Sequence, residues 1–487
     1  MSKFPTPPGQ NAFLTPTRFE ADVYDCEVEG QIPSGLKGSF VRLGGDWLYP
    51  PKDPTDSPFS QEGFISTFRF NNGSADFKSR WVKNPRFLAD KAAKRQLFGN
   101  YRNPFTDDPS VKGIDRTVSN TTPLAFAGKL FALKEDALPY EIDPKTLNTL
   151  GPWDFHGKYK SQTFTAHPKL DPVSGEMICY GYEATGLVSD DLFLYTIDKQ
   201  GNVTREVRMK VPYVSMVHDI AITQKHVILP IHGFVTSMER LKEGKVHWGW
   251  DDKAPTYFGI IPRDGDAKDL RWFKGPTRAI VHTFNARTEG NKVILEAPIF
   301  DASPFPFFPP IDGSKWDPVK GRAFIRRITF DLNSKSDSYK EEILSQQPIV
   351  DLVRIDNRYL GTKQRYGYFG YGDPARPLDE ARTGLTRGRV TNCYGRYDFS
   401  NGKLDTFFAG DTLSLQECCF IPRSKDAPEG DGYLIGTAGN YAEMRTELVI
   451  ADALRLDEGA IAKIKLPVRA PQQVHGIWVG EDELSFA

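Results

Sequence analysis

The feature that most constrains the fold is a recurrence of short segments that mix β-branched and aromatic residues and are bounded by turn residues. Such segments occupy 128–143, 175–184, 191–201, 218–231, 291–300 and 322–332. This pattern is typical of β-strands joined by tight turns. Asn-Gly pairs at 72–73 and 401–402 favour hairpins. Because few helical segments intervene, the chain is predicted to be all-β, as a sandwich, a barrel or a propeller.

The length of the chain favours the propeller among these three. A four-strand unit recurs loosely over the 487 residues, which indicates a propeller of about six to eight blades. No Pro/Gly/Ser-rich linker divides the chain, so we expect one domain over 1–487, with loop insertions that form a cap. The helix expected over 87–99 ends at a glycine, as helices often do, and a second short helix is expected over 377–385.

Composition excludes several classes of partner. With 62 Lys and Arg against 63 Asp and Glu, the net charge of −1 gives no reason to expect a nucleic acid or an anionic membrane. The five cysteines lack C-x-x-C spacing, and adjacent Cys418 and Cys419 are poorly placed to bridge each other, which favours a reducing compartment. The first thirteen residues lack the apolar core of a signal peptide, and no apolar run is long enough to span a membrane. We therefore expect a cytoplasmic protein.

Four of the eight histidines share a setting that could place them on the axis of a propeller. His167, His218, His282 and His475 each directly follow an alanine or a valine in or beside a β-rich stretch. A histidine buried there needs a partner for its ring nitrogens, and either a metal or an ordinary hydrogen bond can serve. The innermost strands of successive blades converge on the axis, so distant histidines can meet there. Imidazole ligands suit iron, zinc and copper, and the spacing alone does not choose between a metal site and four separate core histidines.

Six ordered segments resemble the carotenoid cleavage oxygenase superfamily along nearly the whole chain. The segment 28–46 resembles the family's entry segment, and 128–151 resembles its first inner strand and hairpin. The segments FTAHPKLDPVSGEM, MVHDIAIT, VHTFNA and LPVRAPQQVHGIW carry the four histidines. The resemblance implies a seven-bladed β-propeller with a loop and helix cap over an axial Fe(2+), and O2 as co-substrate. It assigns the iron ligands to His167, His218, His282 and His475; zinc remains a chemical alternative for four imidazoles.

The resemblance also implies residues that act around the metal. Glu135 and Glu417 match family glutamates that hold the outer nitrogens of ligand histidines, and Asp351 stands where a third glutamate is expected. Because aspartate is shorter, Asp351 would need a small backbone shift or a water molecule to reach its histidine. The fourth histidine has no matched carboxylate. Thr121 matches a threonine that limits access to one open metal position, with Thr122 as the neighbouring alternative.

Three further positions resemble the bacterial lignostilbene branch of this superfamily. Phe59, Tyr101 and Lys134 match residues that hold the phenol ring of a stilbene substrate. A lysine beside a tyrosine hydroxyl can stabilise a phenolate, and an aromatic face can stack on a flat substrate. The resemblance therefore implies cleavage of the central C=C bond of 4-hydroxystilbenes into two aromatic aldehydes, with Lys134 and Tyr101 as catalytic residues. It also implies a homodimer, which no residue pattern in the chain indicates.

Two rival functions remain at this point. An apocarotenoid oxygenase would cleave long polyenes that have no hydroxyl group, and a binding propeller without iron would have no reason to keep all four histidines. The run SPFPFFPPI, at 303–311, is too short and too rich in proline to be a membrane helix. We expect it to form a wall of the substrate tunnel or a subunit contact rather than to touch a membrane.

Overall fold

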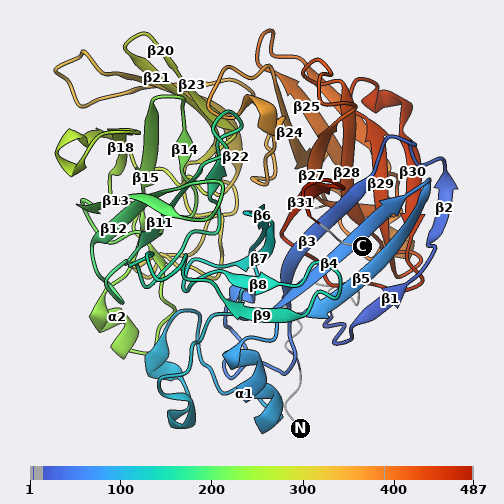
Figure 1. The fold of residues 1–487 in the computed structure, drawn as a ribbon, viewed down its shortest axis with the longest axis horizontal. Helices are drawn as coiled ribbons and strands as arrows, with labels where there is room; N and C mark the ends of the chain where they lie inside the picture. Colours follow the sequence, from blue (N-terminus) through green and yellow to red (C-terminus); the bar gives the residue numbers. More distant parts are fainter. Residues whose placement is uncertain (1–3, 5–14, 389, 485–487) are drawn as a thin grey trace.

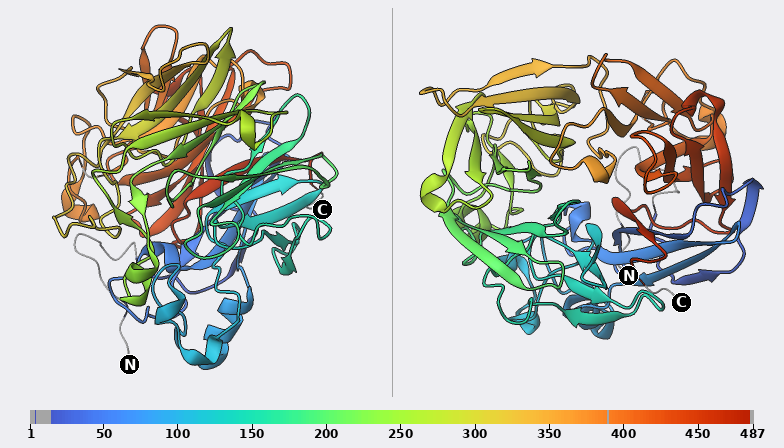
Figure 2. Two further views of the ribbon diagram at one scale, coloured as in Figure 1. Left: turned by 90° about the vertical axis from the view of Figure 1, so that its left-hand side faces the viewer. Right: turned by 45° about the horizontal axis from the view of Figure 1, so that its top comes forward.

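The computed structural model describes residue 4 and residues 15–388 and 390–484, and within these ranges the strands form seven sheets around a common axis. Figure 2 shows the sheets following one another around a ring in the order of the chain. The fold is a seven-bladed β-propeller, as predicted. The first thirteen residues, expected to carry no targeting signal, lie outside the described residues apart from Phe4.

Blades 1 to 4 are numbered here in the order in which their main strands occur. Blade 1 contains β1 (Ala21–Val23), β3 (Gly38–Asp46), β4 (Glu62–Asn71), β5 (Ser74–Trp81) and β31 (His475–Gly480). Blade 2 contains β6 (Thr122–Phe126), β7 (Lys129–Leu133), β8 (Tyr140–Ile142) and β9 (Thr149–Pro152). Blade 3 contains β10 (Lys169–Leu170), β11 (Met177–Tyr182), β12 (Asp191–Ile197) and β13 (Val203–Lys210). Blade 4 contains β14 (Ala221–Ile222), β15 (His226–Ile231), β18 (Thr256–Pro262) and β19 (Arg271–Gly275).

Blades 5 to 7 complete the ring. Blade 5 contains β20 (Asn285–Glu289), β21 (Lys292–Phe300), β22 (Ala323–Asp331) and β23 (Lys340–Ile343). Blade 6 contains β24 (Tyr366–Tyr371), β25 (Cys393–Asp398) and β26 (Leu404–Phe408). Blade 7 contains β2 (Glu27–Gly30), β27 (Leu413–Pro422), β28 (Gly432–Asn440), β29 (Arg445–Asp452) and β30 (Ala460–Lys465). A small separate sheet pairs β16 (Phe234–Val235) with β17 (Gly249–Trp250).

The sequence explains how individual strands fit into the blades. Every residue of β28 is buried, because both faces of this strand pack inside the molecule, whereas β5 mixes buried and exposed positions. The hairpin between β4 and β5 turns at Asn72 and Gly73, which both have positive φ, so this predicted Asn-Gly turn is confirmed. Blade 6 has three named strands, and its inner position is taken by 350–354, where Arg354 forms a bridge with Tyr368.

Two strands from opposite ends of the chain close the ring. The C-terminal β31 is the innermost strand of blade 1 and pairs with β3, so that His475 lies opposite Leu43. The N-terminal β2 is the outermost strand of blade 7 and pairs with β30, with Glu27 opposite Lys465. These exchanges leave the first and last blades hydrogen-bonded to both ends of the chain, and they place His475 beside the axis.

A cap of loops and short helices lies on one side of the ring. Figure 1 shows α1 (Pro85–Ala93) and α2 (Met238–Lys242) near each other at its lower edge. The predicted helix over 87–99 is confirmed in part: α1 begins at Pro85, after the capping side chain of Asn84, and ends at Ala93 rather than at Gly99. Lys94 adopts the left-handed conformation that ends α1. A third helix, α3 (Glu380–Thr383), lies within the predicted range 377–385.

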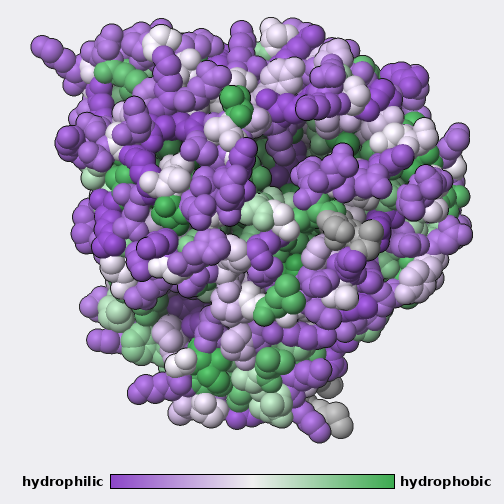
Figure 3. Space-filling model, viewed as in Figure 1, coloured by the Kyte–Doolittle hydropathy of each residue, from purple (hydrophilic) through white to green (hydrophobic). Residues whose placement is uncertain are grey.

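The visible surface is mainly hydrophilic, with apolar side chains gathered over the cap (Figure 3). Leu88 of α1 and Phe105 are each about half exposed. Among residues 15–388 and 390–484, no helix has the length and apolar character that a membrane crossing requires. All five cysteines are buried and unbridged, including the adjacent Cys418 and Cys419.

Candidate metal centre and substrate cavity

The four predicted histidines meet at the axis of the propeller. His167, His218 and His282 lie just before β10, β14 and β20, and His475 begins β31. These are the innermost strands of four blades, so each histidine enters the centre from a different direction. One ligand nitrogen from each ring lies within 4.8 Å of the others. The fold therefore brings together side chains that are more than 300 residues apart in sequence.

The chemistry of this cluster fits a divalent transition metal. Burial lowers the pKa of His282 and His475 to about 3 and that of His167 well below its ordinary value, so these rings are neutral and each can offer a lone pair. The Nε2 atoms of His167 and His218 are 2.9 Å apart, and the Nε2 atom of His475 is buried with no hydrogen-bond partner in the described part of the chain. Converging neutral imidazole nitrogens without protein partners are a suitable donor set for iron, zinc or copper.

A different carboxylate contacts the outer nitrogen of three of these histidines. Glu135 contacts His218 Nδ1, Asp351 Oδ2 lies 2.6 Å from His282 Nδ1, and Glu417 Oε1 lies 2.9 Å from His475 Nδ1. Such contacts fix the ring orientation and leave Nε2 free to bind a metal. The structure thus brings all three sequence-predicted carboxylates to the cluster, and His167 is the member without one.

Asp351 reaches its histidine directly, without the bridging water that its shorter side chain suggested. The backbone explains the reach. Val350 N donates to Gly370 O and Arg354 bridges to Tyr368, so the segment carrying Asp351 lies against the inner edge of blade 6. Burial raises the pKa of the Asp351 carboxyl well above its usual range.

Glu417 is the most highly connected of the three carboxylates. It lies at an irregularity in β27, where the register with β28 shifts between Leu415 and Cys418. Such bulges re-aim side chains. Its Oε2 accepts hydrogen bonds from Gly476 N at 2.8 Å and from Arg354 Nη2 at 2.8 Å. Arg42 Nη1 lies 3.5 Å from the same oxygen. Burial alone would raise the Glu417 pKa, but Arg354 and the other neighbours lower it, so the group is a carboxylate.

The three predicted phenol-binding residues also come together, and Lys134 is their centre. Its buried Nζ lies 5.2 Å from the centroid of the Phe59 ring and 5.1 Å from that of Tyr101. Glu135 Oε2 is 4.0 Å from the same nitrogen. Lys134 and Glu135 follow the end of β7 rather than forming part of the strand; Lys134 donates to Asn120, and Glu135 contacts His218. Burial lowers the pKa of Lys134 and raises that of the Tyr101 hydroxyl.

Asn120 joins this group and was not singled out from the sequence. Its Oδ1 accepts a hydrogen bond from Lys134 Nζ at 3.0 Å, and its Nδ2 donates to the carbonyls of Phe59 and Gln61. Asn120 therefore ties the lysine to the loop that carries Phe59. The β6–β7 hairpin, with Thr122 opposite Leu133, brings Asn120 beside Lys134, whereas the contacts of Asn120 with Phe59 and Gln61 depend on how blade 2 meets the cap. Thr121, the next residue, is buried, and its N donates to Leu133 O; its role in limiting access to the metal stays a prediction.

The proline-rich run at 303–311 packs against Phe59 and Tyr101 of this group. The rings of Phe305, Phe307 and Phe308 lie 5.5, 5.0 and 5.8 Å from the Phe59 ring between centroids. Phe308 also lies 5.9 Å from Tyr101. These aromatic side chains turn toward Phe59; whether the run forms a tunnel wall or a subunit contact stays a prediction.

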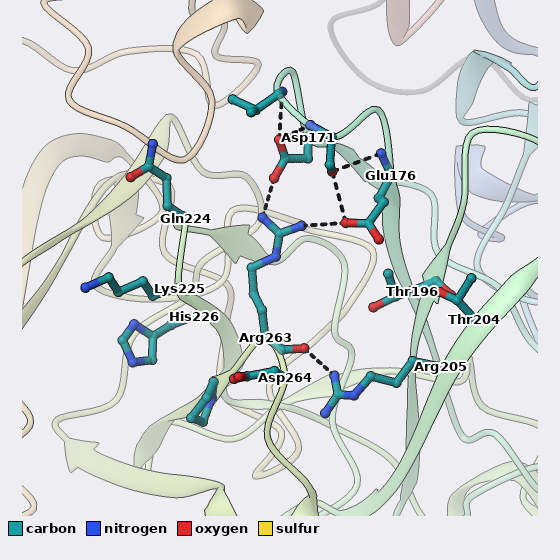
Figure 4. Close-up of a pocket in the computed structure, with 13 residues that line it drawn as sticks. Asp171, Glu176, Thr196, Thr204, Arg205, Gln224, Lys225, His226, Arg263 and Asp264 are labelled. Atoms are coloured by element: carbon teal, nitrogen blue, oxygen red, sulfur yellow. Dashed lines mark hydrogen bonds and ion pairs between the residues drawn. The ribbon is translucent and has the colours of Figure 1, made fainter.

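A separate cavity of about 880 Å³ lies between blades 3 and 4. It is lined by the turns that follow β10 and β14, whereas His167 and His218 lie just before these strands. In Figure 4, the Arg263 guanidinium points toward Asp171 and Glu176, and Arg205 donates to the Arg263 carbonyl. His226 lies on the other side of the cavity and hydrogen-bonds to Thr288. Arg263 is thus paired with two carboxylates, and none of the four clustered histidines lines this cavity.

Comparisons with known proteins agree with this geometry. Residues 14–480 match the protein family described as "Retinal pigment epithelial membrane protein". The lignostilbene-α,β-dioxygenase isozyme III of Sphingomonas paucimobilis is 40% identical over the whole of both chains. The isoeugenol monooxygenase of Pseudomonas putida is 42% identical over 96% of each. The crystal structure of Pseudomonas brassicacearum lignostilbene dioxygenase superposes with a TM-score of 0.95, at 39% identity, over 99% of this chain and 100% of that one.

Proposed function

Because the chain belongs to the retinal pigment epithelial membrane protein family, the carotenoid cleavage oxygenases, we propose that it cleaves the central C=C bond of 4-hydroxystilbenes with O2. Membership makes the protein an alkene-cleaving oxygenase with a four-histidine metal site of the iron-dependent type. The observation that supports a phenolic substrate is the buried Lys134 ammonium beside Tyr101 and Phe59. A substrate without a hydroxyl group would offer this buried nitrogen no polar contact beyond those that it already makes with Asn120 and Glu135.

The four histidines would hold Fe(2+), the metal typical of this family. The iron, when bound, supplies the activation of O2. The carboxylates of Glu135, Asp351 and Glu417 keep three of the imidazoles turned so that Nε2 faces the axis. Thr121 is proposed to crowd one side of the metal and to leave the other side free for O2.

Lys134 and Tyr101 are proposed to bind the phenol oxygen of the substrate. Tyr101 keeps its proton, because burial raises its pKa, so its hydroxyl can donate a hydrogen bond to that oxygen. Burial lowers the pKa of Lys134, so its ammonium gives a proton to a phenol oxygen more readily than an exposed lysine would. Negative charge on the phenol oxygen spreads through the ring to the alkene and makes its carbons more reactive toward oxygen.

The aromatic cavity completes the recognition of a flat substrate. Phe59 can stack on the phenol ring, while Phe305 and Phe307 hold Phe59 in place. The reaction balances as one alkene and one O2 giving two aldehydes, because each alkene carbon receives one oxygen atom. A stilbene with a 4-hydroxyl group would thus give two aromatic aldehydes.

A second candidate is a phenol that carries a propenyl group, as in isoeugenol. The 42% identity to an isoeugenol monooxygenase favours it, and such a substrate would place its hydroxyl on the same lysine and tyrosine. The two candidates differ in what lies beyond the alkene, a second ring or a methyl group.

The test compares four substrates with the Fe(2+)-loaded protein in air: 4-hydroxystilbene, unsubstituted stilbene, isoeugenol and an apocarotenoid. We expect kcat/KM to be highest for 4-hydroxystilbene and at least about a hundredfold lower for unsubstituted stilbene, since loss of a charge-assisted hydrogen bond and a buried partner costs about 3 kcal/mol. Faster cleavage of isoeugenol would favour the second candidate. Preference for the apocarotenoid would contradict a phenolic substrate altogether.

A further inference from the structure

Tyr101, the proposed hydrogen-bond donor to the phenol, lies in a loop whose backbone is tightly fixed. Its N donates to Asp56 Oδ1 at 2.9 Å, and its carbonyl accepts from His247 N at 3.3 Å. The next residue, Arg102, has a φ of +51°, a left-handed conformation that non-glycine residues seldom adopt. Such a conformation persists where the surrounding contacts hold it in place.

The side chain of Arg102 supplies those contacts. Its buried guanidinium donates from Nη1 to the Tyr182 hydroxyl at 2.8 Å and from Nη2 to Glu183 Oε2 at 2.5 Å. It also lies beside the neighbouring Tyr182 and Trp248 rings, 5.1 and 5.6 Å from their centroids. A planar guanidinium with directed hydrogen bonds and two aromatic neighbours has one favourable orientation.

His247 closes this arrangement into a ring of contacts. Its Nε2 lies 3.0 Å from Glu183 Oε1, and its Nδ1 lies 3.1 Å from the carbonyl oxygen of Arg102. Both partners are acceptors, so a neutral His247 ring donates to one of them and a protonated ring to both, and burial lowers the pKa of His247. Burial would raise the pKa of Glu183, but His247 and Arg102 lower it to about 2, so it stays a carboxylate. The path runs from the Arg102 side chain through Glu183 and His247 back to the Arg102 backbone.

The three residues come from three separate parts of the fold. Arg102 belongs to the Tyr101 loop, Glu183 follows β11 of blade 3, and His247 follows α2 of the cap. Asn103 reinforces the same junction, because its Nδ2 donates to the carbonyls of Leu241 and Lys245. The loop that carries Tyr101 is thus held between blade 3 and the cap by buried side chains.

We propose that Arg102, Glu183 and His247 are positioning residues that set the Tyr101 hydroxyl for the phenol of the substrate, an inference that rests on the proposed function. His247 contacts the carbonyls of Tyr101 and Arg102, and Glu183 holds the side chains of Arg102 and His247. Their proposed action is through the Tyr101 loop and not on the reacting atoms. Without the Glu183 carboxylate, the Arg102 guanidinium loses its ion pair. The left-handed backbone conformation of Arg102, next to Tyr101, is then no longer fixed by that contact. The hydroxyl then occupies a range of positions and donates less well to a bound phenol, while the apolar cavity is unchanged.

The experiment measures binding of two ligands that the enzyme cannot cleave. 4-Hydroxybibenzyl and bibenzyl have a saturated central bond and differ only in the hydroxyl group. Both dissociation constants are measured by titration of the Fe(2+)-loaded protein under nitrogen. The dissociation constant of bibenzyl divided by that of 4-hydroxybibenzyl gives the contribution of the hydroxyl group to binding. Removing one hydrogen bond from it, as in Tyr101→Phe, should lower this ratio about fivefold.

We expect Glu183→Gln to lower the ratio by a similar factor while leaving the affinity for bibenzyl within about twofold of wild type. Added to Tyr101→Phe, Glu183→Gln should then have no further effect on the ratio, because the hydroxyl that it positions is gone. The matched control is Glu296→Gln, which removes another buried carboxylate, paired with Arg287 at 2.8 Å in blade 5, and should leave the ratio unchanged.

Three results would overturn the inference. If Glu183→Gln weakened the binding of both ligands equally, Arg102, Glu183 and His247 would only stabilise the cap in general. If its effect on the ratio added to that of Tyr101→Phe, these residues would act independently of the Tyr101 hydroxyl. An unchanged ratio in Tyr101→Phe would remove the proposed role of Tyr101 itself, and the inference with it. If Glu183→Gln does not fold, His247→Gln is measured in its place with the same expected ratios.

Discussion

Replacing Glu417 by glutamine should weaken the metal site and the closure of the propeller together. One Glu417 oxygen accepts from His475, and the other accepts from the backbone of Gly476 and from Arg354, with Arg42 close by. Glutamine has one acceptor oxygen instead of two, and its amide N–H groups would face these donors. Both His475 and Gly476 belong to β31, the strand that closes blade 1.

The size of both effects follows from burial. Arg42 is fully buried, so it would keep its charge next to a neutral side chain, and breaking such a pair costs about 3–5 kcal/mol. Loss of a carboxylate behind a metal-bound histidine lowers metal affinity about 10- to 100-fold. Glu135 is the matched control, because it contacts His218 and lies 4.0 Å from Lys134 but touches no closing strand. Glu135→Gln should lower metal affinity by a similar factor and cost only about 1–3 kcal/mol of stability.

Two measurements separate these effects. Competition with a chelator gives the iron affinity of each variant, and urea unfolding of the metal-free proteins gives the change in stability. We expect Glu417→Gln to show both losses and Glu135→Gln to show mainly the first. If the two variants lose the same stability, the link between Glu417 and the closing strand is wrong. If neither loses affinity for iron, the carboxylates do not orient the ligands.

Three further outcomes are expected. Burial raises the pKa of Asp90 in α1 to about 7 from 3.8, so the folded state binds the proton more tightly than the unfolded state and stability falls as pH rises from about 4 to 7. Asp90→Asn should therefore stabilise the protein at pH 8 by up to about 4 kcal/mol, seen as a higher melting temperature, and hardly at pH 5. An equal gain at both pH values would refute the raised pKa of Asp90. Phe59→Ala should raise KM for 4-hydroxystilbene about tenfold with less change in kcat, because the ring offers a stacking face; a pure kcat effect in steady-state kinetics would contradict that role. Removal of the metal with a chelator should abolish cleavage and lower the melting temperature, and re-addition of Fe(2+) should restore both; a chelator-resistant activity would argue against the metal centre.

Patterns that repeat along the chain predicted the architecture well. Turn residues between β-rich segments indicated an all-β propeller, and the family resemblance supplied the number of blades and the four histidines. The boundaries of α1 were less predictable, because its end depends on Lys94 adopting a left-handed conformation instead of on the glycine five residues later. The direct contact of Asp351 with His282 likewise depends on the path of the backbone beside β24, which side-chain length alone does not reveal.

Contacts between distant segments could not be predicted from local patterns. Asn120 lies in an ordinary polar stretch; the β6–β7 hairpin places it beside Lys134, but its contact with the Phe59 carbonyl depends on how blade 2 packs against the cap. Arg102 and Glu183 are 81 residues apart, and neither carries a motif. The four histidines differ from these residues because each lies just before, or at the start of, an innermost strand, so the topology alone carries it to the axis.

The most direct test of the account is cleavage of 4-hydroxystilbene under ¹⁸O2 by the Fe(2+)-loaded protein. The products are reduced at once to alcohols, so that label is not exchanged with water, and analysed by mass spectrometry. Wild type is run beside Lys134→Ala and beside Lys129→Ala, which removes a lysine at the start of β7 that is paired with Glu141. The account predicts two labelled products from wild type and Lys129→Ala, and far less of either from Lys134→Ala. Absence of both products, or equal yields from all three proteins, would contradict it.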